Sequence, residues 1–261
     1  MAEDKRAGKG VWNATETQRE TTRGRLRSYL HHTKGPLTGF LMGLPLTLIY
    51  SVGMAVRGPS AAGDFLTKLQ FDLLGAWGYL GLQAGLAVIF IVAIAVLQRR
   101  GRFEWRYFGP LIAESTLYAA LVVALMWSVE RYLGLQPHHS IHPTREAALL
   151  AAVGEAVNEE TFFRWIMVPA VLVGLRKLGF ENRLGRGFLG LVVAALLYAT
   201  IAFFVGSGMG DTRSVKGFVT LFVVGVVFTG LFLLRGYTVA AYTHLLYAIY
   251  WAFATPLLSS P

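Results

Sequence analysis

Ionisable residues gather in one apolar stretch of the sequence, between residues 155 and 164. In order they are Glu155, Glu159, Glu160 and Arg164. The residues around them, 147–175, are mostly apolar, and this length is enough to cross the hydrocarbon core of a bilayer. One charged side chain at the centre of such a helix costs about 2.5–3.5 kcal/mol to insert. We therefore predict that these residues face a polar interior, pair with one another or hold protons, and that they are functional.

The spacing of these residues predicts different roles. Glu160 and Arg164 stand four residues apart with the acid first, which is the favourable order for an ion pair on an α-helix. Glu159 lies about 100° around the helix from Glu160 and has no basic residue four positions after it. Glu155 precedes Glu159 by one α-helical turn, and two carboxylates on one buried face suit a general base that works near neutral pH. The alternative for Glu160 and Arg164 is a packing pair without a chemical role.

A single histidine lies inside a later apolar segment. His244 follows Arg235 by nine residues, which places it roughly 13 Å along a helix from that basic turn. Glu159 lies about midway along its own segment, so the two side chains are compatible with one site near the bilayer centre. The alternative is that His244 is a hydrogen-bonding residue of the core.

Three more histidines stand close together in a polar loop. His138, His139 and His142 have a spacing that could bind a transition metal, although exposed loop histidines are the favoured explanation. We assign no metal ligands and no cofactor, and we leave a divalent metal open.

The composition predicts a membrane protein. Of the 261 residues, 54% are hydrophobic and 15% are charged, whereas soluble domains have near 25% charged residues. The absence of cysteine excludes disulfides and cysteine nucleophiles. We predict an all-α fold, a polytopic transmembrane helical bundle of about seven spans. The predicted spans are residues 37–56, 73–97, 108–133, 147–175, 187–205, 215–234 and 237–255.

The basic residues predict the orientation. With these seven spans, 17 of the 24 Lys and Arg residues fall on one side of the membrane and six on the other. By the positive-inside rule the N-terminus is cytoplasmic and the C-terminus lies outside. The net charge of +9 then orients the chain, and no nucleic acid partner is expected. Residues 1–35 form a basic cytoplasmic arm, 36–146 hold the first three spans with their loops, and 147–256 form a core of four spans.

Two motifs resemble one protease family. The run Glu159-Glu160-Thr161-Phe162-Phe163-Arg164 matches the EExxxR motif of the CAAX-protease and bacteriocin-processing family, which includes the type II CAAX prenyl endopeptidases. Residues 236–244, which end in His244, resemble its last helix, which carries an HxxxN-like motif. The resemblance extends over about residues 147–255. It implies that 147–256 is a catalytic core, that Glu159 activates a water, and that histidines assist or stabilise the oxyanion.

The chain departs from that family at two positions. The middle motif, FxxxH, corresponds to Tyr198-Ala199-Thr200-Ile201-Ala202, so Ala202 stands in place of histidine. The asparagine of the last motif corresponds to Ala248. Tyr198, Thr200 or Asn158 could supply a compensating hydrogen-bond donor, with Glu155 as a further auxiliary residue.

These observations predict an intramembrane endopeptidase with Glu159, Glu160, Arg164 and His244 as catalytic residues. Its partners are the lipid bilayer and a membrane-anchored peptide or protein substrate, which the chain cleaves as in CAAX processing or in the removal of a C-terminal sorting signal. One alternative is an inactive membrane scaffold or immunity-type protein, which the missing histidine favours. The other is a proton-coupled transporter, which the lack of internal repeats argues against.

Overall fold

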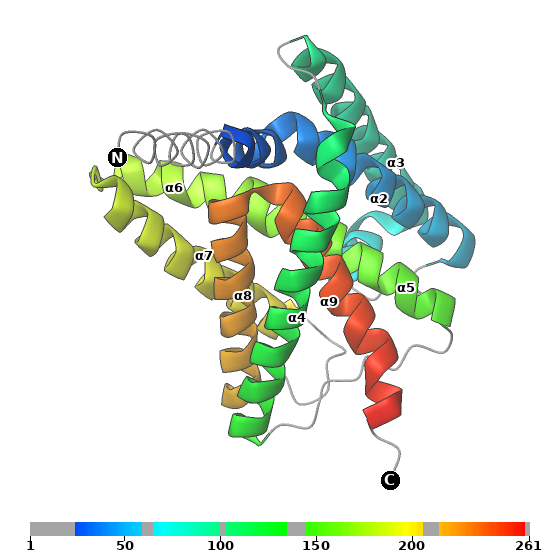
Figure 1. The fold of residues 1–261 in the computed structure, drawn as a ribbon. Helices are drawn as coiled ribbons and strands as arrows, with labels where there is room; N and C mark the ends of the chain where they lie inside the picture. The colour runs from blue at the N-terminus through cyan, green and yellow to red at the C-terminus, as the bar shows by residue number, and fades with distance from the viewer. Residues whose placement is uncertain (1–23, 59–64, 100–102, 135–144, 206–213, 259–261) are drawn as a thin grey trace, which may run out of the picture.

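The computed structural model describes residues 24–58, 65–99, 103–134, 145–205 and 214–258. These residues form helices, and no β-strand occurs among them (Figure 1). Within the described ranges, five helices are long and apolar enough to cross a membrane. They span Pro36–Arg57, Leu66–Gln98, Trp105–Leu133, Arg183–Phe204 and Val215–Arg235. The prediction of an all-α polytopic bundle is confirmed.

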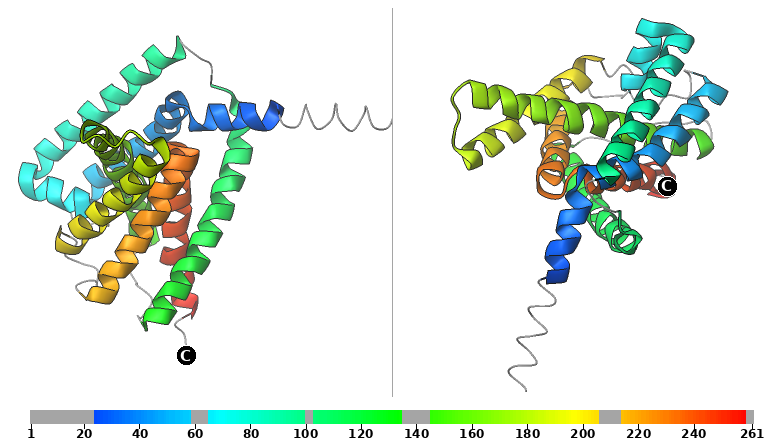
Figure 2. Two further views of the ribbon diagram at one scale, coloured as in Figure 1. Left: turned by 90° about the vertical axis from the view of Figure 1, so that its left-hand side faces the viewer. Right: turned by 90° about the horizontal axis from the view of Figure 1, so that it is seen from above.

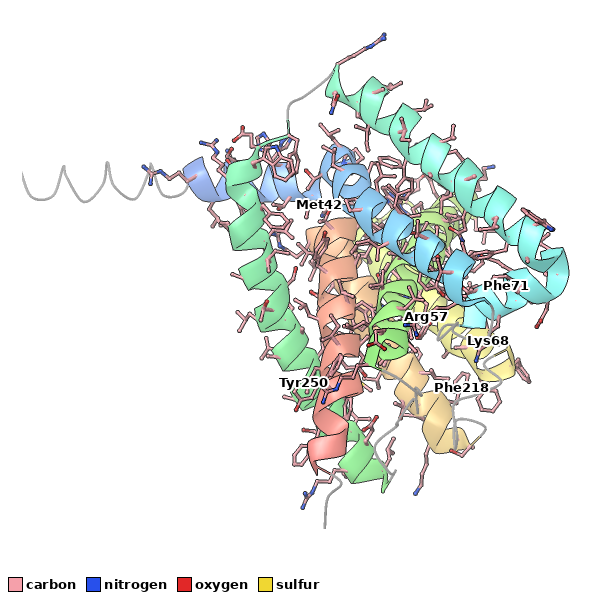
Figure 3. All side chains as sticks on the ribbon, turned by 90° about the vertical axis from the view of Figure 1, so that its right-hand side faces the viewer. Met42, Arg57, Lys68, Phe71, Phe218 and Tyr250 are labelled. Atoms are coloured by element: carbon pink, nitrogen blue, oxygen red, sulfur yellow. The ribbon has the colours of Figure 1, made fainter. Side chains whose placement is uncertain are left out.

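The first two spans form a packed pair with an unpredicted turn. Helix α2 covers Pro36–Arg57 and packs on α3, which covers Phe65–Gln98. Gly75 has φ +66°, a conformation that glycine adopts readily, and it divides α3 into a short and a long part. Figure 3 shows the short part, with Lys68 and Phe71, turning back beneath the long one. The sequence placed the start of this span at residue 73, and the short part before the turn was not predicted.

Three of the remaining helices run side by side. They are α4 over Phe108–Leu133, α8 over Val215–Arg235 and α9 over Tyr237–Leu258, and α7 over Arg183–Val205 packs against α8 (Figures 1 and 2). A single residue, Gly236, joins α8 to α9. Its φ of +85° ends α8, and α9 begins at the next residue.

The predicted fourth span is not one regular helix. It consists of α5 over Arg145–Gly154, a π-helix over Glu155–Met167 and α6 over Val168–Lys177. This continuous run crosses α4, α8 and α9 at a steep angle (Figures 1 and 2). Neither this run nor α9 is among the five candidate spans, so the count of seven spans remains a prediction.

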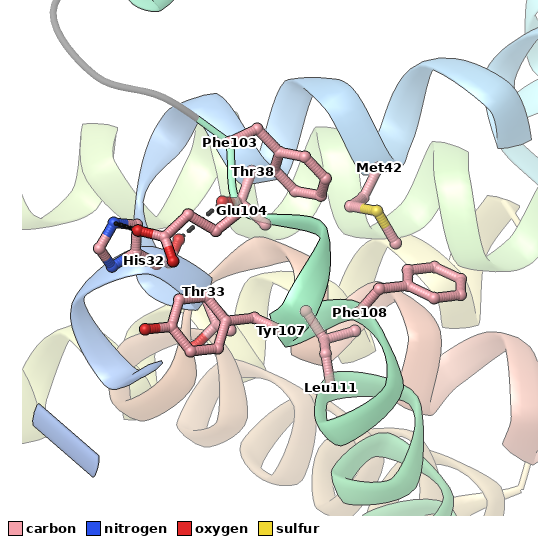
Figure 4. A pocket seen from close by; sticks show the side chains of 9 residues that line it. All are labelled: His32, Thr33, Thr38, Met42, Phe103, Glu104, Tyr107, Phe108 and Leu111. Atoms are coloured by element: carbon pink, nitrogen blue, oxygen red, sulfur yellow. Dashed lines mark hydrogen bonds and ion pairs between the residues drawn. The ribbon is translucent and has the colours of Figure 1, made fainter. Parts of the chain in front are cut away.

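Part of the predicted N-terminal arm contacts the bundle. Residues 24–34 form a helix, and residues 1–23 lie outside the described part of the chain. The Tyr29 hydroxyl donates to Glu114 Oε2 of α4 over 2.5 Å, and Ser28 shares a hydrogen bond with Tyr107. His32 lies 3.3 Å from Glu104, where Figure 4 shows the two side chains facing each other. These contacts hold the helix against the end of the bundle where the first span begins.

Candidate active site

The predicted catalytic carboxylates lie on the π-helix and are buried. The exposed fraction is 3% for Glu159 and 0% for both Glu160 and Arg164. A π-helix has i→i+5 hydrogen bonds and commonly occurs as a single turn at functional sites, whereas this one covers 13 residues. In a helix with this hydrogen-bond spacing, residues four positions apart still lie close to one face, so the common face of Glu155 and Glu159 stays a prediction.

Glu160 is the centre of a charged cluster. Arg164 Nη1 lies 3.4 Å from Glu160 Oε1, which confirms the predicted ion pair. His244 Nδ1, from α9, lies 2.9 Å from the same oxygen atom. His244 therefore contacts Glu160, the residue next to the Glu159 with which the sequence predicts a common site. Depth along a helix had suggested a common site correctly, but it carried no information about which of two adjacent carboxylates the imidazole faces.

Glu159 has a different partner. The hydroxyl of Tyr198, from α7, donates to Glu159 Oε2 over 3.1 Å. The centre of the Tyr198 ring also lies 4.7 Å from the Arg164 guanidinium carbon, so this tyrosine contacts both Glu159 and Arg164. Of the donors proposed to compensate for the missing histidine, Tyr198 is the one that the structure brings to the carboxylates.

Aromatic rings enclose the Arg164 guanidinium. Its carbon lies 5.8 Å from the Phe163 ring centre and 5.7 Å from that of Phe228, both within the range of cation–π attraction. Phe228 also stacks on His244, with centroids 4.5 Å apart. The role of Phe228 could not be predicted from the sequence, because a phenylalanine on the apolar helix α8 resembles its lipid-facing neighbours.

Several polar atoms of this cluster have no hydrogen bond. They are Nε, Nη1 and Nη2 of Arg164 and Oε2 of Glu160, and they lack a hydrogen-bond partner among the described residues although all are buried. Buried polar groups are nearly always hydrogen-bonded in folded proteins, and exceptions are often found at reactive sites. The cluster thus presents donors and an acceptor that the surrounding protein does not satisfy.

Two of the predicted auxiliary residues, Asn158 and Thr200, have different surroundings. Asn158 donates to Thr67 of α3 over 2.7 Å, and the Tyr50 hydroxyl of α2 donates to the same oxygen over 2.9 Å. Asn158 thereby ties the π-helix to the first two spans. Thr200 is exposed, because it follows Tyr198 by two residues and so lies about 200° around α7. The prediction that Thr200 donates a hydrogen bond at the site is wrong.

The two alanines that replace family residues do face the interior. Ala202 is 6% exposed and lies one turn after Tyr198, in the buried core that also contains Phe163 and Phe228. Ala248 is 8% exposed and lies one turn after His244. The backbone thus presents both motif positions on the inner faces of their helices, but neither carries a polar group.

The described residues contain no group of three or more His, Cys, Asp or Glu side chains arranged to hold a metal ion. His138, His139 and His142 fall in the segment 135–144, outside the described part of the chain. A divalent metal therefore stays an alternative, without assigned ligands.

The fold and these contacts define an integral membrane protein of all-α class with a buried cluster of carboxylates, arginine, histidine and tyrosine. Residues 144–250 match the family model described as Type II CAAX prenyl endopeptidase Rce1-like. This segment contains the whole cluster, and the match confirms the family resemblance found in the motifs. No curated protein and no solved structure matches the chain. The family match supports CAAX-type intramembrane protease activity in general.

Proposed function

We propose that this protein is an intramembrane endopeptidase that hydrolyses a peptide bond in a membrane-tethered protein or peptide precursor. One observation carries the proposal. Three elements of the family-matching segment, the π-helix, α7 and α9, bring a carboxylate, a tyrosine and a carboxylate–arginine–histidine group into one buried cluster. Keeping these groups in the core costs free energy, because each must be removed from water, and a role in chemistry explains why the protein keeps them.

Glu159 is the general base in this proposal. It takes a proton from a water molecule while Tyr198 holds the carboxylate in place through its hydroxyl. The water oxygen forms a bond to the scissile carbonyl carbon. The carbon–nitrogen bond then breaks, and the proton held by Glu159 passes to the leaving amine. The products are a carboxylic acid and an amine, and no further reactant is consumed.

The second carboxylate, Glu160, positions the Arg164 and His244 side chains for the same reaction. Glu160 Oε1 contacts both Arg164 and His244, so these two side chains are held on one side of the cluster. Negative charge develops on the carbonyl oxygen as the water attacks, and fixed donors in a dry site stabilise it strongly. The guanidinium N–H groups without hydrogen-bond partners and the second ring nitrogen of His244 are the donors that we assign to this role.

The substrate is expected to be a membrane-tethered segment, because the cluster is buried in the bundle and a soluble peptide would have no direct access. CAAX processing and removal of a C-terminal sorting signal both present such a segment. Purified protein in nanodiscs would be tested with both kinds of precursor. We expect Glu159→Gln to abolish cleavage and Glu181→Gln, which changes an exposed carboxylate between α6 and α7, to leave it intact. Cleavage that survives Glu159→Gln would overturn the mechanism.

A second function has one observation in its favour. Because Ala202 and Ala248 occupy the family's histidine and asparagine positions, the protein could be a non-catalytic binding partner that has kept the bundle. In that case no precursor is cleaved, while a precursor or partner still co-purifies with the Glu159→Gln variant as it does with the unaltered protein. Cleavage of any precursor that depends on Glu159 excludes this function.

A further inference from the structure

A groove separate from the charged cluster opens at the end of the bundle that carries the N-terminal helix. Its cavity volume is about 260 Å³, somewhat below the roughly 300–1,000 Å³ of pockets that take a whole drug-sized ligand. Helices 24–34, α2, the π-helix, α8 and α9 all contribute to its walls. The lining residues are Lys34, Gly35, Pro36, Gly39, Trp165, Phe232, Leu233, Gly236 and Tyr237. The size suits one segment of an elongated molecule.

The floor of the groove is apolar and includes a stacked aromatic pair. Trp165 and Tyr237 stack with ring centres 4.4 Å apart and planes within 16° of each other. Gly39 packs against this pair, because a Cβ atom there would lie 3.3 Å from the Trp165 ring and 3.6 Å from the Tyr237 ring. Ile166 and Leu234, which follow two lining residues in the chain, are large apolar side chains with exposed fractions of 58% and 73%. Such side chains at the surface of a membrane protein face lipid, so the groove adjoins acyl chains.

The rim carries one charge. Lys34 is the only charged residue among those that line the groove, and its Nζ donates to the Leu233 carbonyl over 2.7 Å. That bond uses one of three ammonium hydrogens and neutralises no charge. No acidic side chain pairs with Lys34 in the described part of the chain. The ammonium group is therefore held beside the apolar floor with two donors remaining.

The backbone keeps Lys34 at this place. Gly236 has φ +85° and ψ 179°, a region that is essentially restricted to glycine. A Cβ atom at Gly236 would lie 3.1 Å from the Lys34 Cα and 3.2 Å from its Cγ. The close approach of the two segments therefore depends on glycine, and it sets the ammonium group at the rim.

We propose that this groove binds an anionic phospholipid, with an acyl chain on the Trp165–Tyr237 floor and the headgroup phosphate on Lys34. The basic residues predict that this end of the bundle is cytoplasmic, and the cytoplasmic leaflet is the one that carries anionic lipids. The site reaches toward the charged cluster, since the Tyr237 hydroxyl shares a 3.1 Å hydrogen bond with Thr161, the residue after Glu160. The proposal does not depend on the proposed peptidase activity.

The test is native mass spectrometry of the full chain released from nanodiscs that contain equal amounts of phosphatidylcholine and phosphatidylglycerol. We expect retained phosphatidylglycerol in excess over phosphatidylcholine. Lys34→Gln should lower that retention about fivefold, because one Lys or Arg near the surface contributes about that factor to the binding of anionic lipid. Leu233→Trp, which keeps the backbone carbonyl and fills the groove, should remove retention altogether. Lys177→Gln, an exposed lysine outside the groove, should leave it unchanged.

Three results would overturn the proposal. Equal losses in Lys34→Gln and Lys177→Gln would mean that the basic surface as a whole attracts lipid, without a site at the groove. Unchanged retention in Leu233→Trp would place the lipid elsewhere. A Leu233→Trp variant that keeps its phosphatidylglycerol but loses precursor cleavage would assign the groove to the substrate.

Discussion

Two arginine–carboxylate clusters lie in the bundle, and they differ in how completely their hydrogen bonds are made. At the end near the N-terminal helix, Arg235 Nε and Nη2 donate to the two oxygens of Glu114 over 2.5 and 2.6 Å. Tyr29 donates to the same carboxylate, and Arg235 Nη2 also contacts Thr33. In the candidate site Arg164 approaches Glu160 only to 3.4 Å, and its three guanidinium nitrogens have no hydrogen-bond partner among the described residues.

The difference separates a structural cluster from a reactive one. Bidentate pairing satisfies the Glu114–Arg235 cluster, which joins α4, α8 and the N-terminal helix. Burial, together with the hydrogen bond and the charge of Glu114, raises the pKa of Tyr29, so this hydroxyl remains a neutral donor. The Glu160–Arg164 cluster is more deeply buried and less satisfied, and its open donors and acceptor are what a substrate or a transition state can use.

The largest expected difference between the clusters is in activity. Glu160→Gln should lower the rate of precursor cleavage at least about 100-fold, because it removes the group that holds Arg164 and His244 in position. Glu114→Gln should leave the rate within about threefold once the variant is folded. Initial rates in nanodiscs measure both. Equal losses in the two variants would show that the clusters do not differ in the way described.

Stability should follow the opposite order. Arg235→Met leaves the part-buried Glu114 without its bidentate partner, and we expect a loss of about 3 kcal/mol in the free energy of unfolding, from two hydrogen bonds to a charged group at about 1.5 kcal/mol each. Arg164→Met should be less destabilising, because that guanidinium makes no hydrogen bond in the described structure and Glu160 keeps His244. Denaturant titration in mild detergent compares the two. A larger loss for Arg164→Met would contradict the assignment of Arg235 as the structural residue.

The tyrosines give a smaller, matched comparison. Tyr198→Phe removes the hydroxyl that donates to Glu159, and a hydrogen bond to a charged group contributes about 1.5 kcal/mol, so cleavage should fall about tenfold. Tyr29→Phe removes the equivalent bond to Glu114 and should lower stability by a similar energy without changing the rate. Rate and unfolding measurements on both variants test the pair. A slower Tyr29→Phe enzyme would link the N-terminal helix to the chemistry.

The smallest expected effect concerns Gly236, beside the structural cluster. Gly236→Ala introduces a side chain in a backbone conformation that favours glycine, and it brings a Cβ atom against Lys34. We expect a loss of about 1 kcal/mol in stability. The control is Gly174→Ala, since a Cβ atom at Gly174 meets nothing within 4 Å. Thermal unfolding of the two variants should differ, and equal behaviour would show that the α8–α9 turn accommodates a side chain.

The sequence predicted the site where the chemistry depends on spacing within one helix. The Glu160–Arg164 pair follows from four-residue separation, and the inward face of Ala202 follows from its one-turn distance to Tyr198. The all-α bundle follows from apolar length and from the need to satisfy the backbone in lipid.

What could not be predicted depends on how the helices rotate and pack. The partner of His244 is set by the rotation of α9 against the π-helix, which depth along the helix does not reveal. The π-helix itself has no recognised pattern in the residues. Phe228 and Asn158 acquire their roles from neighbours on other helices, Arg164 and Thr67.

The one-residue connection at Gly236 couples the movements of α8 and α9 closely. His244 lies seven residues beyond the start of α9, about 10 Å along the helix axis, and no loop intervenes to absorb a displacement. On the other arm, Lys34 and Arg235 fasten the same corner to the N-terminal helix and to α4. A tilt of α9 imposed at the membrane surface would therefore change the distance between the His244 imidazole and Glu160.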